Sequence, residues 1–360
     1  MAKWTHLRMR FPPFDAPSHI PSEMKETVVH WPSKSDDTSL SIGDDNGWFI
    51  RRELVNEVPK GSKLVEEVDS SSATQNLLAT RSGWALSPHP LHSIARKLIP
   101  YGVMILILAI VLHVLEPVLI RWGIMSEAFA GSINIGLLDY PIMFVMAAPF
   151  VVIPLILRVV ANVEDIRRQH RFKDNPPSSP RIKVDSAFAE GPVSVIVELS
   201  NSLSKSKITG QVRVGLLPPH RNAMMAAHIG NLMGRPPVGL STPLPDGWMP
   251  VADDGSGIGE TTPMVVGRGP ARLFQEPMRI QVSGPKKDIE SGTKHELETP
   301  EGPWPGCEYG GYVNINWELV LKFVIKGRRP LYWVEKLNVK SGKSHSVPHL
   351  LADSGRLEST

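Results

Sequence analysis

The sequence holds a single cysteine, Cys307, among its 360 residues. One cysteine excludes an internal disulfide framework and a cysteine-based zinc site. No Asn-X-Ser/Thr acceptor occurs either, so nothing in the sequence indicates a glycosylated extracellular domain. The net charge of +3 is too small to indicate nucleic-acid binding, and we expect no nucleic-acid partner.

Catalytic motifs are also lacking. The sequence contains no serine-centred elbow, no HExxH pair of histidines and no dinucleotide fingerprint. His295 stands beside Glu296 and Glu298, but no nucleophile accompanies these acid–base groups, which are ordinary on a solvated strand edge. We therefore expect no enzymatic activity and no cofactor.

Two long apolar runs dominate what is present. No apolar stretch follows the basic first ten residues, so we expect no cleaved signal peptide and a retained membrane anchor. Leu98–Ile120 has 23 residues, and at about 1.5 Å per residue it spans a hydrocarbon core about 30 Å thick. A second run covers residues 137–160. The pair predicts a two-helix transmembrane hairpin with a short external loop at residues 121–136.

The distribution of basic residues predicts the orientation of this hairpin. Residues 122–136 contain no Lys or Arg, whereas Arg96 and Lys97 precede the first run. A basic juxtamembrane helix, residues 161–175, is expected after the second run. It carries a basic cluster that we expect to bind anionic lipid headgroups, at about 1 kcal/mol per residue: Arg167, Arg168, Arg171 and Lys173. The positive-inside tendency then puts both termini in the cytoplasm, at the cell membrane.

Two ionisable residues interrupt the first span. His113 and Glu116 are three residues apart and therefore lie on one helical face. Ionisable groups inside a membrane are functional hypotheses, here a proton relay or ion site of a channel or transporter subunit built from several hairpins. Alternatively, the pair lies near the interface, where it snorkels, stabilises a homo-oligomer or faces the second helix. We favour this structural interpretation.

The polar regions on either side of the hairpin differ in pattern. Residues 1–95 are rich in proline, serine and charge, and we expect them to be largely disordered. From residue 181 to residue 342 the hydrophobic period changes to two, which predicts an all-β domain built as an antiparallel β-sandwich. Its clearest strand is Val313–Ile325, with Asn314, Asn316 and Glu318 on the solvent face. Residues 343–360 are expected to form a flexible tail.

Two segments of this β domain resemble the arrestin-like (Ig-like) β-sandwich proteins. HELETPEGPWPGCEYGGYVNINWELVLKFVIKG, residues 295–327, is similar to that family's region where a proline-containing strand end and a loop lead into a long strand. The matching residues are Pro300, Pro303, Tyr309, Ile315, Trp317 and Leu319. GPVSVIVELSNSLSKSKITGQVRVGLL, residues 191–217, is similar to the family's opening hairpin. The resemblance implies a non-enzymatic adaptor or scaffold.

A long insert, residues 218–270, interrupts the expected sandwich. If its first part is helical, His220, Met224 and His228 fall on one face with ligand types that suit Cu(I). The same residues also fit a methionine-rich plug at the end of the sandwich or an adaptable partner surface. We favour the plug.

Together these patterns predict a membrane-anchored interaction protein that presents a cytoplasmic β-sandwich to an unknown protein partner. Exposed strand edges or the insert would be its contact surface. The alternatives are an oligomeric channel or transporter subunit that uses His113 and Glu116, and a metal-handling protein that uses the insert.

Overall fold

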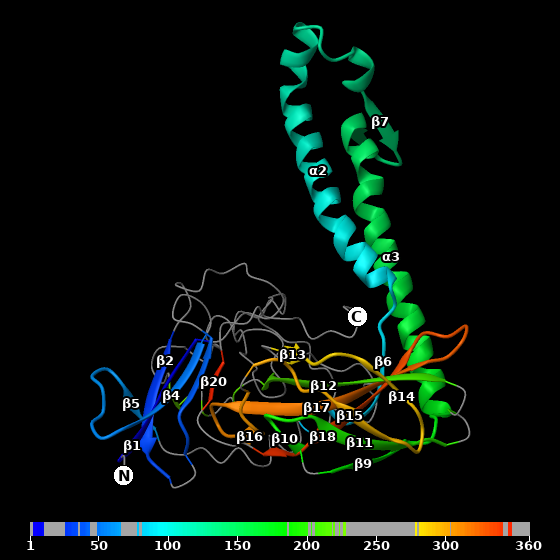
Figure 1. The fold of residues 1–360 in the computed structure, drawn as a ribbon. Coiled ribbons are helices and arrows are strands. Elements are labelled where there is room, and N and C mark those ends of the chain that lie inside the picture. Colours follow the sequence, from blue (N-terminus) through cyan, green and yellow to red (C-terminus); the bar gives the residue numbers. More distant parts are fainter. Residues whose placement is uncertain are drawn as a thin grey trace. The chain divides into compact units, whose positions relative to one another are not determined.

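The computed structural model describes most of the chain and divides it into two compact units (Figure 1). The first, which we call the β unit, comprises Met1–Ser87 and Pro177–Ser359, and the helical unit comprises Pro88–Pro176. The described residues are 3–10, 26–34, 37–43, 49–65, 78, 81–185, 187–200, 203, 206–217, 219, 223, 226–227, 278, 281–302, 304–340 and 345–347.

The helical unit contains the two long apolar helices that the sequence predicts. They are α2 (Leu91–Arg121) and α3 (Ile142–Asp174), joined by the 3₁₀ turn η2 (Glu127–Phe129) and by the strands β7 (Ser132–Ile135) and β8 (Leu138–Pro141). α2 begins before residue 98, its expected start, and α3 continues through the basic segment, where a juxtamembrane helix was expected. Residues 138–141 were expected to be helical, but they form the strand that pairs with β7.

The described residues of the β unit form four sheets. The largest has the order β13–β12–β17–β18–β6, with β14 beside β12 and β16 beside β17, and a three-stranded sheet has the order β15–β11–β9. Their strands are β6 (Gly83–Leu86), β9 (Arg181–Val184), β11 (Val193–Glu198), β12 (Lys207–Leu217), β13 (Gln281–Ser283), β14 (Lys287–Ile289), β15 (Lys294–Leu297), β16 (Glu308–Tyr309), β17 (Asn314–Val324) and β18 (Leu331–Leu337). β10 (Ala187–Phe188) and β19 (Val339–Lys340) form a two-stranded parallel sheet.

One hydrophobic core joins the seven-stranded and three-stranded sheets. Alternate residues of β11, from Val193 to Val197, are fully buried, as are the inward residues of β17 from Ile315 to Phe323. The period-two pattern therefore identifies both strands correctly. β11 and β12 do not pair with each other, however, because each belongs to a different sheet. The expected opening hairpin is thus a crossing from one sheet to the other.

The expectation of a largely disordered N-terminal region is wrong for the residues that the structure describes. They form a sheet of order β20–β3–β4–β1–β2–β5. Leu7 and Met9 of β1 are buried in the same core as β11 and β17, and this burial compensates for the cost of ordering a polar segment. The strands are β1 (Trp4–Arg10), β2 (Thr27–Pro32), β3 (Leu40–Gly43), β4 (Phe49–Val55), β5 (Lys63–Leu64) and β20 (His345–Val347). β20 lies in the expected flexible tail and pairs with β3.

The helical unit is therefore an insertion in the β unit and does not precede a separate C-terminal domain. β6 pairs with β18 and immediately precedes α2, whereas β9 pairs with β11 and follows α3. The chain thus leaves the β unit at Ser87 and returns to it at Pro177.

Candidate functional site

The two helices pack along a seam of small residues. Buried positions on α2 recur every seven residues, at Ala95, Gly102 and Ala109. α3 repeats the same spacing at Ala147, Pro154 and Ala161. A Cβ atom built on Gly102 would lie 2.5 Å from the carbonyl oxygen of Phe150, so the helix backbones approach closely. Small residues on an interhelical face are typical of packing in membranes, where lipid gives no hydrophobic drive for association.

The remaining surface of both helices is apolar and exposed. In the most apolar 18-residue window of each helix, only 6% of α2 and 11% of α3 is buried. Met104 is 61% exposed, Leu155 52% and Val159 60%. A core helix of a soluble protein would bury most of such a window. Length, composition and exposure together make α2 and α3 suitable for crossing a bilayer.

His113 and Glu116 are brought together within a single hairpin. His113 Nδ1 lies 2.8 Å from Glu116 Oε2, and the His113 ring meets the ring of Phe144 of α3 edge-on at 5.7 Å between centroids. Glu116 is seven residues beyond Ala109 and therefore continues the seam, with a side chain only 15% exposed. Within the hairpin, the His113 ring therefore lies against α3.

A second polar contact, which we did not predict, lies near the start of α2. The buried Asp165 of α3 accepts a hydrogen bond from the backbone N–H of His89 at 2.9 Å, and its Oδ2 is 3.1 Å from His92 Nε2. Asp165 therefore links α3 to the residue before Pro90, the N-cap of α2, and to the His92 side chain in the first turn of α2. The sequence signal was its position four residues after Ala161, on the buried side of α3.

The basic cluster lies on the last turns of α3. Arg167 and Arg171 are 66% and 74% exposed, and both lie near Glu164, at 3.2 and 3.9 Å. Arg168 is half-buried, and Lys173 is exposed. Exposed guanidinium and ammonium groups on one helix end can contact anionic headgroups.

The predicted copper ligands His220, Met224 and His228 lie outside the described residues. Within the part of the chain that the structure describes, no group of three His, Cys, Asp or Glu residues could hold a metal ion. The metal hypothesis therefore stays a prediction about the insert.

The β unit contains a buried charge cluster that the sequence pattern did not predict. Glu318 of β17 is 1% exposed and lies between two guanidinium groups. Arg81 Nε donates to Glu318 Oε1 at 2.5 Å, and Arg213 Nη2 donates to Oε2 at 2.6 Å. Asn316 donates to the same carboxylate at 2.7 Å, and the Tyr309 hydroxyl donates to Asn316 at 2.8 Å. The polar face of β17 was expected to be solvated, but these partners bury it.

This environment determines the ionisation state of Glu318. Burial by itself would raise the pKa of Glu318, but the charges and hydrogen bonds of Arg81 and Arg213 lower it to about 2. A carboxylate that is ionised and saturated with donors is unsuited to proton transfer near neutral pH. The cluster therefore joins β12 and β17 to the segment before β6.

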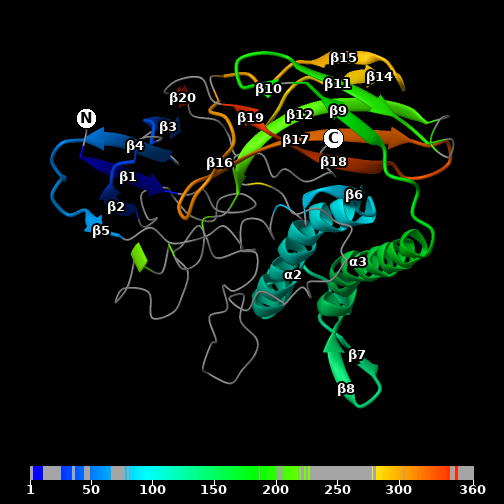
Figure 2. The same cartoon turned by 90° about the horizontal axis from the view of Figure 1, so that it is seen from below.

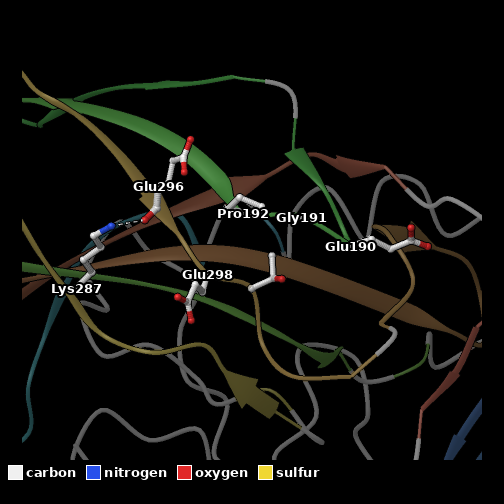
Figure 3. A pocket seen from close by; sticks show the side chains of 7 residues that line it. Glu190, Gly191, Pro192, Lys287, Glu296 and Glu298 are labelled. Carbon is white, nitrogen blue, oxygen red and sulfur yellow. Dashed lines mark hydrogen bonds between the residues drawn. The ribbon is translucent and has the colours of Figure 1, made fainter.

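A hollow of about 360 Å³ opens at the edge of the sheets, beside β14 and β15 (Figure 3). It is lined by Glu190, Gly191, Pro192, Lys287, Glu296, Glu298 and Thr299. Its acidic side chains are exposed, and Lys287 Nζ donates to the backbone oxygen of Glu296 at 3.0 Å.

The His295 side chain forms its contacts within its own turn. Its Nε2 accepts the backbone N–H of Glu290 at 2.9 Å and lies 2.5 Å from the Thr293 hydroxyl. These contacts leave that nitrogen no free lone pair for an acid–base partnership with the neighbouring glutamates.

Comparison with known proteins adds no family to this description, because no protein-family model, curated protein or solved structure matches the chain.

Proposed function

We propose that the protein is a membrane-tethered interaction protein. Its helical unit crosses the cell membrane as a hairpin, and its β unit binds a partner protein in the cytoplasm. We also propose that the seven-stranded and three-stranded sheets form a β-sandwich of the arrestin-like kind, which is supported by the core that β11 shares with β17.

The observation that carries this proposal is the insertion of the exposed apolar hairpin between two strands of one folded unit. Trp84 Nε1 of β6 donates to the carbonyl oxygen of Pro177 at 3.1 Å, so the segment before α2 is bound to the segment after α3. A single folded unit lies on one side of a membrane. Two consecutive spans that start from and return to it must therefore cross in opposite directions.

Charge supports the cytoplasmic side. The basic cluster on α3 and the Arg96–Lys97 pair on α2 lie at the ends of the helices that connect to the β unit. The opposite ends carry one basic residue, Arg121 at the end of α2, and are joined by residues 122–141, which contain no Lys or Arg. This asymmetry follows the positive-inside tendency.

The free edge of β9 is the contact surface that we propose. β9 pairs only with β11 among the described strands, and Asp185 N–H donates to Ser194 at 3.1 Å. This register directs the backbone groups of Ile182 and Val184 away from β11. Val184 is 37% exposed and Phe188, in the next strand, is 52% exposed. An extended partner segment would hydrogen-bond to the strand and cover these side chains.

Photo-cross-linking in native membranes tests this proposal. A photoreactive amino acid in place of Val184 should capture a specific protein, because an added strand lies about 4.8 Å from its neighbour. Val324 is the matched control, since it is also an exposed valine, at 44%, but lies at the end of the central strand β17. Adducts that form equally at both positions, or at neither, would contradict the assignment of the edge.

A further inference from the structure

We propose that the segment between the two helices, residues 122–141, is itself a lipid-binding element that lies in the interface of the outer leaflet. This inference rests on the proposed function, because it requires that α2 and α3 cross the membrane.

The segment exposes an unusual number of large apolar side chains for a surface connection. Leu137 is 100% exposed, Trp122 70% and Ile124 68%. Three more of its exposed side chains are Phe129, Leu138 and Tyr140, at 45%, 61% and 40%. Large apolar side chains exposed together on one short segment indicate an interaction surface.

The β7–β8 ribbon is amphipathic. Its register pairs Ile133 with Tyr140, and Leu138 lies on the same face two residues from Tyr140. The opposite face carries the pair Asn134 and Asp139, joined by a hydrogen bond of 3.0 Å. One face of the ribbon is therefore apolar and the other polar, as an element at a boundary between hydrocarbon and water requires.

The turn between the two strands also exposes an apolar side chain. Gly136 has φ +70°, which suits the tight turns of two-stranded hairpins. The next residue, Leu137, is at the tip, where polar residues are usual. A fully exposed leucine there is unfavourable in water and favourable in the acyl-chain boundary.

The depth of the ribbon follows from the packing of the helices. Phe144, in the first turn of α3, contacts His113 of α2, so α3 begins near the level of His113. α2 continues for eight residues beyond His113, to Arg121, which corresponds to about 12 Å. Beside those last turns of α2 lies the connecting segment and not a second helix. Along the axis of α2, the start of α3, from which the ribbon projects, therefore lies about 12 Å before the end of α2.

The ribbon projects from the start of α3 (Figures 1 and 2). Open edges of a two-stranded sheet are not tolerated in hydrocarbon, because their backbone groups need water or protein partners. The interface supplies water to those edges and hydrocarbon to the apolar face. Trp122 and Tyr140 are residue types that concentrate at this depth.

Depth measurement with spin labels tests the inference in the full chain reconstituted into phosphatidylcholine–phosphatidylglycerol vesicles. Cys307→Ser removes the native thiol and keeps a donor for the Leu337 carbonyl, which Cys307 contacts at 3.0 Å. Single cysteines then carry a nitroxide at Leu137, or at Leu138 as a second variant on the apolar side. Asn134 gives a matched position on the polar face, and Ile107 a position in the span. Accessibility to oxygen and to a water-soluble nickel complex reports depth.

We expect the Leu137 and Leu138 labels to favour oxygen over nickel, less strongly than the Ile107 label but more strongly than the Asn134 label. Nickel accessibility at Leu137 and Leu138 equal to that at Asn134 would overturn the interfacial element while leaving the spans intact. A water-accessible Ile107 label would instead refute the proposed span. Spin–spin broadening between chains at Leu137 would also overturn the inference, because a second copy would then cover this face.

Discussion

Replacing Glu318 by glutamine should strongly destabilise the β unit. The substitution keeps the shape of the side chain but removes the negative charge between Arg81 and Arg213. Two buried guanidinium groups then lose the negative charge that lies between them. Breaking a buried ion pair in this way costs about 3–5 kcal/mol.

The pKa of Glu318 gives an independent magnitude. The pKa falls from its ordinary value of 4.5 to about 2 in the folded protein, a difference worth about 3 kcal/mol. The folded state binds the proton more weakly than the unfolded state. This stabilisation is therefore fully present above pH 4.5 and is lost as the pH falls toward 2. At pH 3 about 1 kcal/mol of it should remain.

Urea unfolding of the full chain in detergent measures these quantities. Trp304 and Trp317 are fully buried in the core and report unfolding by their fluorescence. Wild-type and Glu318→Gln proteins should differ in free energy of unfolding by about 3 kcal/mol or more at pH 7, and by much less at pH 3. Glu198→Gln is the control, because the Glu198–Lys183 pair is solvent-exposed and its loss should leave the midpoint unchanged.

Comparing the loss of stability in two variants gives a sharper test. Arg213→Met removes one of two positive charges and leaves Glu318 paired with Arg81, so it should cost less than Glu318→Gln. If Arg213→Met is the more damaging substitution, or if the difference between wild type and Glu318→Gln does not depend on pH, the reasoning is refuted.

Three further predictions concern other contacts. Gly102→Leu should force the helices apart, because even a Cβ would lie 2.5 Å from a carbonyl oxygen of α3. This overpacking costs about 1–3 kcal/mol, so a lower dodecyl sulfate concentration should separate the two helices. Val103→Leu, on the lipid-facing side, should leave that concentration unchanged. Burial lowers the pKa of His6 below 6.5, so the stability that neutral His6 provides is present above pH 6.5 and lost below it. Hydrogen-exchange protection of β1 should therefore fall between pH 7 and 5 in wild type and stay constant in His6→Gln; parallel loss in both would contradict this. Asp165→Ala should speed exchange of the His89 amide, which loses its acceptor, whereas Glu164→Ala should not.

The membrane helices and the central strands were predictable because their signals are local. The first apolar run, interrupted by His113 and Glu116, is recognisable within 23 residues, and the alternation of β17 is recognisable within 13. The seam was readable too, since Ala95, Gly102 and Ala109 recur at a fixed spacing. The precise helix ends were not, because they depend on the β7–β8 ribbon and on the contact of His89 with Asp165.

The polar face of β17 and the N-terminal sheet were not predictable, because both depend on contacts between residues far apart in sequence. Glu318 looks like a solvent-facing residue until Arg81 and Arg213 are known to lie beside it, and these are 237 and 105 residues away. β1 alternates inward Leu7 and Met9 with charged residues, but much of the core in which they are buried comes from strands more than 180 residues later.

The most direct test of the account is the sidedness of the two chain ends in sealed membrane vesicles. Reporter tags on both termini should be digested by protease only when the cytoplasmic face is accessible, and the intact chain should leave the membrane only in detergent. Tags protected on opposite sides, or release of the chain by an alkaline wash alone, would contradict a hairpin that holds the β unit at the membrane.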